Sequence, residues 1–205
     1  MNESCAPMQY TSSAIPDPEI PRSRVALLQH VLETYASETN KVIAVWASFT
    51  DAELGYRPHA SSSSVADIMK HQLLSERRFF AEFMGVPEVA ANQVLPQTSS
   101  VEKFSKRLLE LASPRLAFLA EQDEEWWLTV VPFFDARRER IWIFWRRVLH
   151  TAHHRTQLTV YLRLLGKAVP ATYGPTADVS WQGADPTTTV EAAGRPGNTG
   201  NTSSD

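Results

Sequence analysis

Residues 137–166 read RRERIWIFWRRVLHTAHHRTQLTVYLRLLG, and this stretch decides the fold. At about 100° per residue, the turn of an α-helix groups four of its apolar residues on one face. They are Ile143, Leu158, Leu164 and Leu165. Gly166 follows, and glycine is common just beyond the end of a helix. The pattern predicts one long helix from about Arg137 to Leu165.

Two more helices are predicted in the first half of the chain. Apolar residues recur at three- and four-residue steps from Leu28 to Phe49, which predicts a long first helix. A second helix is predicted from Val65 to about Met84, where Gly85 stops it. One serine of the run 61–64 is expected to cap its start, because serine side chains accept hydrogen bonds from free backbone N–H groups.

A third helix is predicted from residue 99 to about residue 121. Ser99 and Glu102 have the spacing of a capping box at its start, and Pro114 is expected to kink or restart it. The next segment, WWLTVVPFFD at 126–135, has the character of a short strand or loop. Four long helices predict an all-α fold, an antiparallel four-helix bundle.

The two ends of the chain lack a periodic apolar pattern. Residues 1–19 carry prolines among serines and threonines, and residues 183–205 are rich in glycine, proline, threonine and asparagine. Such segments bury too little apolar surface to offset the entropy of ordering them. We therefore predict flexible tails at 1–19 and 183–205 around one helical domain at 20–182.

Composition limits the classes of function. A formal net charge of -3 lacks the positive excess that binding to nucleic acid needs. Cys5 is the single cysteine, which excludes an intramolecular disulfide and favours the reducing cytoplasm. No segment approaches the ~20 apolar residues of a membrane span. We expect a cytoplasmic protein that binds neither nucleic acid nor membrane. The local basic run is assigned to a solvated helix face and consists of Arg137, Arg138, Arg140, Arg146 and Arg147.

Two histidines lie one turn apart on the predicted inner face of the last helix. His150 and His154 are i and i+4 neighbours, a separation at which two side chains can chelate one ion. The alternative is a pair of core histidines with separate hydrogen-bond partners. An unliganded buried pair must stay uncharged at neutral pH, whereas a metal ion takes both lone pairs at once. The pair therefore favours a metal site, with Gln157 and Tyr161 on the same face.

The candidate third ligand is His71, on the second helix. It flanks the apolar stripe of that helix, and Glu76 falls inside the stripe. Two interpretations remain open here. His71 ligates a metal, or it caps a carbonyl group while Glu76 pairs with an arginine such as Arg147 across the helices. His30 and His59 are predicted to be surface residues.

Other common chemistries lack their motifs. The segment HTAHH, residues 150–154, has no glutamate after its first histidine, unlike the HExxH metalloproteases. Glutamate does not occur three residues before any histidine, so the pairs typical of carboxylate-bridged di-iron proteins are absent from the sequence. The sequence also holds no G-x-S-x-G, Walker or G-x-G-x-x-G motif. A mononuclear histidine site is the remaining prediction.

Two segments resemble a known family. Residues 53–80, ELGYRPHASSSSVADIMKHQLLSERRFF, and 150–178, HTAHHRTQLTVYLRLLGKAVPATYGPTAD, are similar to the DinB-like family of metal-binding four-helix bundles. The likeness spans about residues 20–180. In that family a histidine near the middle of helix two and an H-x-x-x-H pair on the last long helix bind a divalent metal. Carried over to this chain, the implied metal ligands are His71, His150 and His154.

The resemblance implies cofactors but no single reaction. The metal in such proteins is nickel, zinc or iron, and some relatives are transferases or isomerases that use a low-molecular-weight thiol. Three neutral histidines leave coordination positions open for water or substrate. Glu76, Gln157 and Tyr161 are candidates to orient or deprotonate that ligand. The loop YGPTAD, residues 173–178, is similar to one branch of the family and is expected over the pocket. Thr156 stands where many relatives have glycine, on a face away from His150.

Two functions of different classes follow. The first is a metal-dependent enzyme, a thiol-dependent transferase or isomerase or a hydrolase, acting on an unidentified small molecule by Lewis-acid activation of water or a thiol. The second is a non-enzymatic, stress-associated bundle in which the metal is structural or vestigial. A homodimer is also expected, because relatives often dimerise and aromatic residues crowd the start of the last helix. These residues are Trp126, Trp127, Phe133, Phe134, Trp142 and Trp145.

Overall fold

The computed structural model describes residues 14–173 and 177–178. Four long helices dominate it: α1 (Gln29–Ala47), α2 (Val65–Arg78), α3 (Val101–Ala120) and α5 (Arg140–Leu164). Between α3 and α5 lie the short helix α4 (Glu124–Leu128) and an antiparallel hairpin of β1 (Val130–Phe133) and β2 (Ala136–Glu139). The remaining elements are the 3-10 turns η1 (Asp17–Glu19), η2 (Ala26–Leu28), η3 (Asp51–Glu53) and η5 (Ala91–Gln93), and the π-helical turn η4 (Phe79–Met84). The fold is mainly helical, and the small sheet corrects the all-α expectation.

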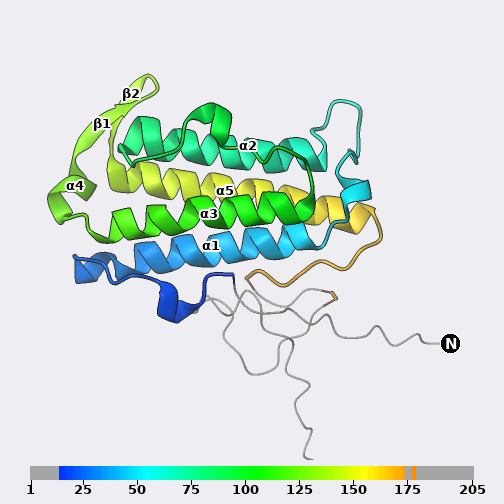
Figure 1. Ribbon diagram of the computed structural model, residues 1–205, viewed down its shortest axis with the longest axis horizontal. Helices are drawn as coiled ribbons and strands as arrows, with labels where there is room; N and C mark the ends of the chain where they lie inside the picture. The colour runs from blue at the N-terminus through cyan, green and yellow to red at the C-terminus, as the bar shows by residue number, and fades with distance from the viewer. Residues whose placement is uncertain (1–13, 174–176, 179–205) are drawn as a thin grey trace, which may run out of the picture.

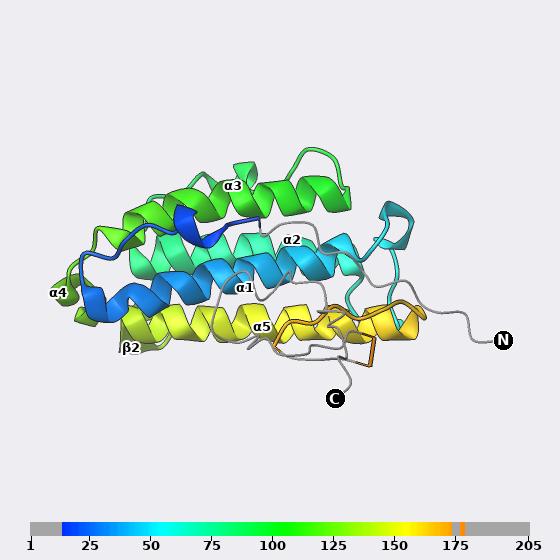
Figure 2. The same cartoon turned by 90° about the horizontal axis from the view of Figure 1, so that it is seen from below.

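The four long helices lie side by side (Figure 1). The main contacts between them join α1 to α3 and α5, and α2 to the same two helices. A view turned by 90° shows α3 and α5 on opposite sides of α1 (Figure 2). His30 stacks on Trp145 and Glu38 pairs with Arg155, so α1 and α5 run in the same direction. The antiparallel arrangement expected from sequence holds for α1 with α3 and for α2 with α5, but not for α1 with α5.

Helix α2 begins and ends as its sequence predicts. The Ser64 side chain accepts a hydrogen bond from the backbone N–H of Asp67, and the Asp67 carboxylate accepts one from the backbone N–H of Ser64. Both bonds satisfy donors that the first turn leaves free. The helix continues into η4 and stops at Gly85, whose φ of 76° is left-handed. Glycine adopts that conformation without steric strain.

Helix α3 differs from its prediction at two points. Its N-cap is Ser100, whose side chain accepts from the backbone N–H of Lys103, and not Ser99. The helix also runs through Pro114 to Ala120 without restarting. The packing of a helix against its neighbours can outweigh the loss of one backbone hydrogen bond at a proline. Local helix propensity alone therefore does not predict whether α3 is interrupted at Pro114.

The segment before α5 also departs from its prediction. Trp126 and Trp127 belong to α4, because Asp123 caps that helix by accepting from the backbone N–H of Trp126. The strand character expected further on is confirmed by β1. Residues 136–139 form β2, so α5 begins at Arg140 rather than at Arg137.

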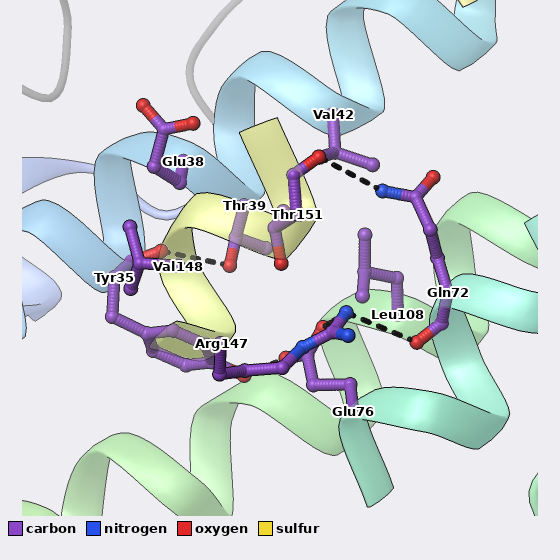
Figure 3. A pocket seen from close by; sticks show the side chains of 10 residues that line it. All are labelled: Tyr35, Glu38, Thr39, Val42, Gln72, Glu76, Leu108, Arg147, Val148 and Thr151. Carbon is purple, nitrogen blue, oxygen red and sulfur yellow. Dashed lines mark hydrogen bonds and ion pairs between the residues drawn. The ribbon is translucent and has the colours of Figure 1, made fainter. Parts of the chain in front are cut away.

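The interior is apolar towards both ends of the helices and polar in the middle. Two hydrophobic clusters fill the ends, one around Phe80 and Phe144 and one around Trp46 and Leu158. Between them lies a layer of buried polar side chains that includes Tyr35, Glu38, Gln72, Glu76, Arg115, Arg147, Thr151 and Arg155. Figure 3 shows side chains of this layer converging from α1, α2 and α5. Burying so many charges requires that each find a partner.

The flexible tails predicted at 1–19 and 183–205 lie mostly outside the described residues. Within the first of them, Ile15 is 4% exposed. Its backbone N–H donates to the Asn40 side chain at 2.8 Å, and its carbonyl accepts from the same amide at 2.8 Å. Ile15 therefore packs on α1, whereas Asp17, Pro18 and Glu19 are exposed. Among the described helices, none has the length and apolar character that crossing a bilayer demands.

Candidate metal centre

Antiparallel packing of α2 against α5 brings the three predicted ligands together. Each of His71, His150 and His154 offers one ring nitrogen, and these atoms lie within 4.8 Å of one another. The Nε2 atoms of His71 and His150 are 3.4 Å apart. On a tetrahedral zinc ion with bonds of about 2.0–2.1 Å, two ligand nitrogens are also about 3.4 Å apart. The group therefore has the dimensions of a metal centre.

The histidines line the edge between α2 and α5. The expectation from sequence that His150 and His154 point into the core is therefore wrong. His71 is exposed, while His150 and His154 are half-buried. The inward face of α5 is rotated away from them, because it carries the buried residues Phe144, Arg147, Thr151, Arg155 and Leu158. The prediction that the arginines lie on the solvated side of the helix therefore placed the histidines deeper in the core than they are. Arg147, expected on that solvated side, is 1% exposed.

The surroundings of all three imidazoles disfavour the charged form and lower their pKa values. Burial and then the charge of Arg147 lower the pKa of His150 to about 3. The same two causes lower the pKa of His71. Burial also lowers the pKa of His154, against a hydrogen bond to Gln157 that favours the protonated ring. Neutral imidazole keeps one lone pair free, and this is the form that binds metal.

One ligand is oriented by a chain of hydrogen bonds. His154 donates from Nδ1 to the Gln157 side-chain oxygen at 3.1 Å, and Gln157 donates to the Tyr161 hydroxyl at 3.2 Å. Tyr161 in turn donates to the Ser63 carbonyl at 3.0 Å. Because the proton of His154 is on Nδ1, its Nε2 lone pair is free for a metal. Gln157 and Tyr161 thus orient the candidate metal ligand His154. The Tyr161 hydroxyl proton is used in the hydrogen bond to the Ser63 carbonyl.

The second ligand of α5 fits a metal only after a proton moves. Arg147 donates to Nδ1 of His150 at 2.8 Å, and arginine has no acceptor, so the neutral ring carries its proton on Nε2. Ligation through Nε2 requires that proton on Nδ1 and the arginine turned aside. Arg147 also donates to the Ser75 hydroxyl at 3.0 Å and to the Gln72 carbonyl at 3.3 Å, so it keeps partners if it leaves His150.

Glu76 belongs to the buried polar layer and is not placed as a ligand. It accepts hydrogen bonds from Tyr35, from Arg115 at 2.9 Å and from Arg147 at 3.4 Å. Figure 3 shows Glu76 together with Tyr35 and Arg147. Burial alone would raise its pKa, but the two arginines and the tyrosine bond together lower it. The expected pairing of Glu76 with Arg147 is confirmed. It does not decide whether His71 ligates a metal. A carboxylate so engaged is poorly suited to act as a base.

In the described part of the chain, a small cavity and a larger pocket lie near the histidines, and the larger one has room for a substrate. The cavity among the polar layer has a volume of about 10 Å³, the size of a single water molecule (Figure 3). The other is an open pocket of about 520 Å³, and His71 and His150 line it. Sequence reasoning missed its walls on η4 and the hairpin, although the aromatic pair at 133–134 marks the place. His30 and His59 are exposed, as predicted.

The loop after α5 lies on a different side of that helix. The Tyr173 hydroxyl donates to Glu38 at 2.8 Å, and the Tyr173 ring lies under the charges of Lys41 and Arg155. These partners belong to α1 and to the α5 face opposite the histidines, so the expectation that Tyr173 covers the histidine pocket is wrong. Asp178 pairs with Arg163 at the surface of α5. Residues 174–176 lie outside the described part of the chain.

Fold and site together define a mainly helical protein with three converging histidines on its second and last long helices. The sequence matches the model of the DinB family over residues 23–185, and the chain belongs to that family. No curated protein matches it.

Two solved structures share the fold. A DinB-like protein from Bacillus cereus is 18% identical with a TM-score of 0.61, and the match covers 71% of this chain and 97% of that one. A DinB-like protein from Bacillus subtilis is 19% identical with a TM-score of 0.57, covering 70% of this chain and 96% of that one. At this identity the likeness concerns the fold.

Proposed function

We propose that the protein binds one divalent metal ion, nickel, zinc or iron, through His71, His150 and His154. The observation that carries the proposal is the convergence of three ring nitrogens within 4.8 Å. The partner of His154 supports it, because a carbonyl-type acceptor on Nδ1 is the usual neighbour of a metal-ligating histidine. Membership of a metal-associated family is consistent with this assignment.

We further propose that the protein is a metal-dependent enzyme. A structural metal is typically enclosed by four protein ligands, whereas three histidines leave positions open. Here His71 is exposed and the large pocket opens beside it, so those positions face a space for substrate. This geometry favours the enzyme over the alternative of a non-enzymatic bundle with a structural or vestigial metal.

The metal would supply Lewis-acid activation of water or of a low-molecular-weight thiol. The protein's own groups do the rest. Gln157 holds the His154 ring in place, and the charged layer around Glu76 fixes α5 against α2. The reaction class that fits is a thiol-dependent transfer or isomerisation, or a hydrolysis. None of these steps needs the carboxylate of Glu76.

Metal content tests the proposal directly. Protein purified without an affinity tag that binds metal, then loaded separately with nickel, zinc or ferrous iron, is expected to keep about one ion per chain after gel filtration. His150→Ala and His154→Ala should abolish stoichiometric binding, and His71→Ala should weaken it. His153→Ala is the matched control, because His153 is an exposed neighbour on the same helix. Equal metal content in all five proteins would refute the site.

We also propose that the protein is a cytoplasmic homodimer. Two of the aromatic residues that motivated this expectation remain accessible, Trp142 at 41% and Phe134 at 59% exposed. Trp127 and Phe133 are buried within the monomer and contribute nothing to an interface. Light scattering at micromolar concentration should give twice the chain mass, and the mass of one chain would contradict the dimer.

A further inference from the structure

The open pocket beside the histidines has walls of two kinds. Its volume of about 520 Å³ lies within the range of small-molecule sites. Aromatic and aliphatic side chains form an apolar wall. The cationic side chains form a charged wall that adjoins it, because the guanidinium carbon of Arg78 lies over the Phe134 ring at 5.3 Å from the ring centroid. The lining residues outside the histidine pair are Leu74, Ser75, Arg78, Phe79, Phe133, Phe134 and Arg146.

The apolar wall begins at the candidate metal centre and continues to the hairpin. Phe79 stacks on His150 with ring centroids 6.2 Å apart and an angle of 27° between the planes. Phe79 then meets Phe133 edge to face at 5.6 Å, and Phe133 meets Phe134 at 4.8 Å. A flat apolar group in the pocket would contact these rings while one end of it reached the histidines.

The hairpin turn contains a strained residue, Phe134, that lines the pocket. Phe134 has a φ of 51°, and it is the sole non-glycine residue with positive φ in the part of the chain that the structure describes. Glycine adopts a positive φ without strain, whereas residues with a side chain rarely adopt it. The Phe134 ring contacts Phe83 at 4.8 Å, yet the residue stays 59% exposed. Strain retained at an exposed aromatic residue indicates a function in binding.

The charged wall favours a ligand that carries a negative charge at its other end. Arg78 and Arg146 line the pocket, and none of its lining residues is acidic among the residues described. Arg78 shares Glu82 with Arg77, so one carboxylate serves two guanidinium groups. The charge of Arg146 meets no carboxylate within 4 Å in the described ranges. The pocket is therefore positive, and a divalent ion on neutral histidines would make it more so.

We propose that this pocket binds an organic anion with a flat apolar body. Its carboxylate or similar group lies between Arg78 and Arg146, and its body lies against Phe79, Phe133 and Phe134. The pocket binds such a molecule whether or not metal is present. That the molecule is a substrate rests on the proposed function, because the reaction would take place at the end nearest the histidines.

A matched series of probes tests the ligand class. Calorimetric titration compares 3-phenylpropanoate with 3-phenylpropanamide, which lacks the charge, and with propanoate, which lacks the ring. Each titration is done on metal-free and on zinc-loaded protein. The phenyl carboxylate is expected to bind up to about fivefold more tightly than the amide, since an accessible charge contact contributes up to about 1 kcal/mol, or fivefold. It is also expected to bind more tightly than propanoate, because it buries its ring against the aromatic side chains. Equal binding of all three probes to metal-free protein would overturn the proposal.

Variants locate the binding. Arg146→Gln should remove the preference for the carboxylate over the amide. Phe134→Gly, which suits the positive φ, should remove the preference for phenylpropanoate over propanoate without loss of stability. Arg24→Gln, an equal charge change far from the pocket, should alter neither. Unchanged preferences in the first two variants would overturn the proposal.

The two proposals fail separately in this experiment. Protein that holds no metal but retains these preferences refutes the metal centre and keeps the anion pocket. Protein that holds zinc in the histidine site but shows no preference among the probes refutes the anion pocket and keeps the metal centre.

Discussion

The buried polar layer and the histidine group are neighbours on α2 and α5 with opposite kinds of chemistry. Glu76 lies about one turn beyond His71 along α2, and Arg147 one turn before His150 along α5. In the layer, Glu76 bonds to Arg115 and Arg147, and Arg115 also pairs with Glu88. The charges are satisfied inside the chain.

The histidines have no acidic complement of this kind. Their ring nitrogens lie close together, and no carboxylate among the described residues completes the group. Polar groups that satisfy one another define a fixed structure, whereas imidazoles without a carboxylate partner are available to an ion from solution once Arg147 releases His150. Polar side chains between these helices therefore have two roles: one group stabilises the fold, and the other can bind an ion. Arg147 contacts both groups and lies at the boundary between them.

The largest expected effect is on the paired region. Glu76→Gln removes the carboxylate that pairs with buried Arg147 and leaves buried Arg115 with Glu88 alone, and breaking such a pair costs about 3 kcal/mol or more. Urea unfolding at pH 7 measures the loss. Glu82→Gln, which removes the partner of two more exposed arginines, should cost less than about 1 kcal/mol. Equal losses in both variants would erase the distinction between a buried layer and surface pairs.

The same substitution predicts a dependence on pH. The folded state lowers the pKa of Glu76, so its contribution is fully present above the unfolded value of about 4.3 and is lost as pH falls through the lower folded value. The stability difference between wild type and Glu76→Gln should be constant from about pH 8 to pH 5 and shrink below about pH 4. A difference that grew on acidification would show that Glu76 is protonated in the fold.

A smaller effect is expected in the histidine region, and only with metal. Zinc at about 100 times its Kd should stabilise the wild-type fold by about 2.7 kcal/mol, because it binds the folded state. In His150→Ala this gain should vanish while metal-free stability changes little, since the residue is only half-buried. Thermal unfolding with and without zinc measures both. A large loss in the metal-free variant would assign His150 to the core instead.

The smallest expected effect concerns the orientation of one ligand. Gln157→Leu removes the acceptor for Nδ1 of His154 and should weaken zinc binding about tenfold, or about 1.4 kcal/mol. Thr156→Val is the matched control, because Thr156 is exposed on another face of α5. Zinc titration against a competing chelator compares them. Identical affinities would show that the hydrogen bond does not orient the ring.

The sequence predicted which histidines meet but not how deep they lie. The i, i+4 spacing of His150 and His154 is a local property, and helix geometry is enough to place both on one face. Their depth depends on which face of α5 turns inward, and Arg147 and Arg155 decide that by pairing with glutamates on other helices. Such pairs form between helices that are distant in sequence. A sequence pattern that places arginine on the surface therefore predicted the wrong rotation of α5 about its axis.

The hairpin and the pocket show the same limit. The strand character of 130–133 was visible in the sequence, but the partner strand reads ARRE, with no apolar alternation to mark it. The interpretation of Glu76 as an ion-pair partner succeeded because a carboxylate inside an apolar stripe needs an opposite charge wherever that charge comes from. Which arginines supply it required the fold.

The shared direction of α1 and α5 has a consequence for how the chain folds. Contacts such as Glu38 with Arg155 join residues 117 positions apart, and long sequence separations slow folding because a large loop must close first. Both histidines of α5 and both arginines that complete the charged layer arrive with this last long helix. A nascent chain that stops before residue 140 has neither. We therefore expect metal binding to appear only when α5 docks, which makes bound metal a reporter of completed folding.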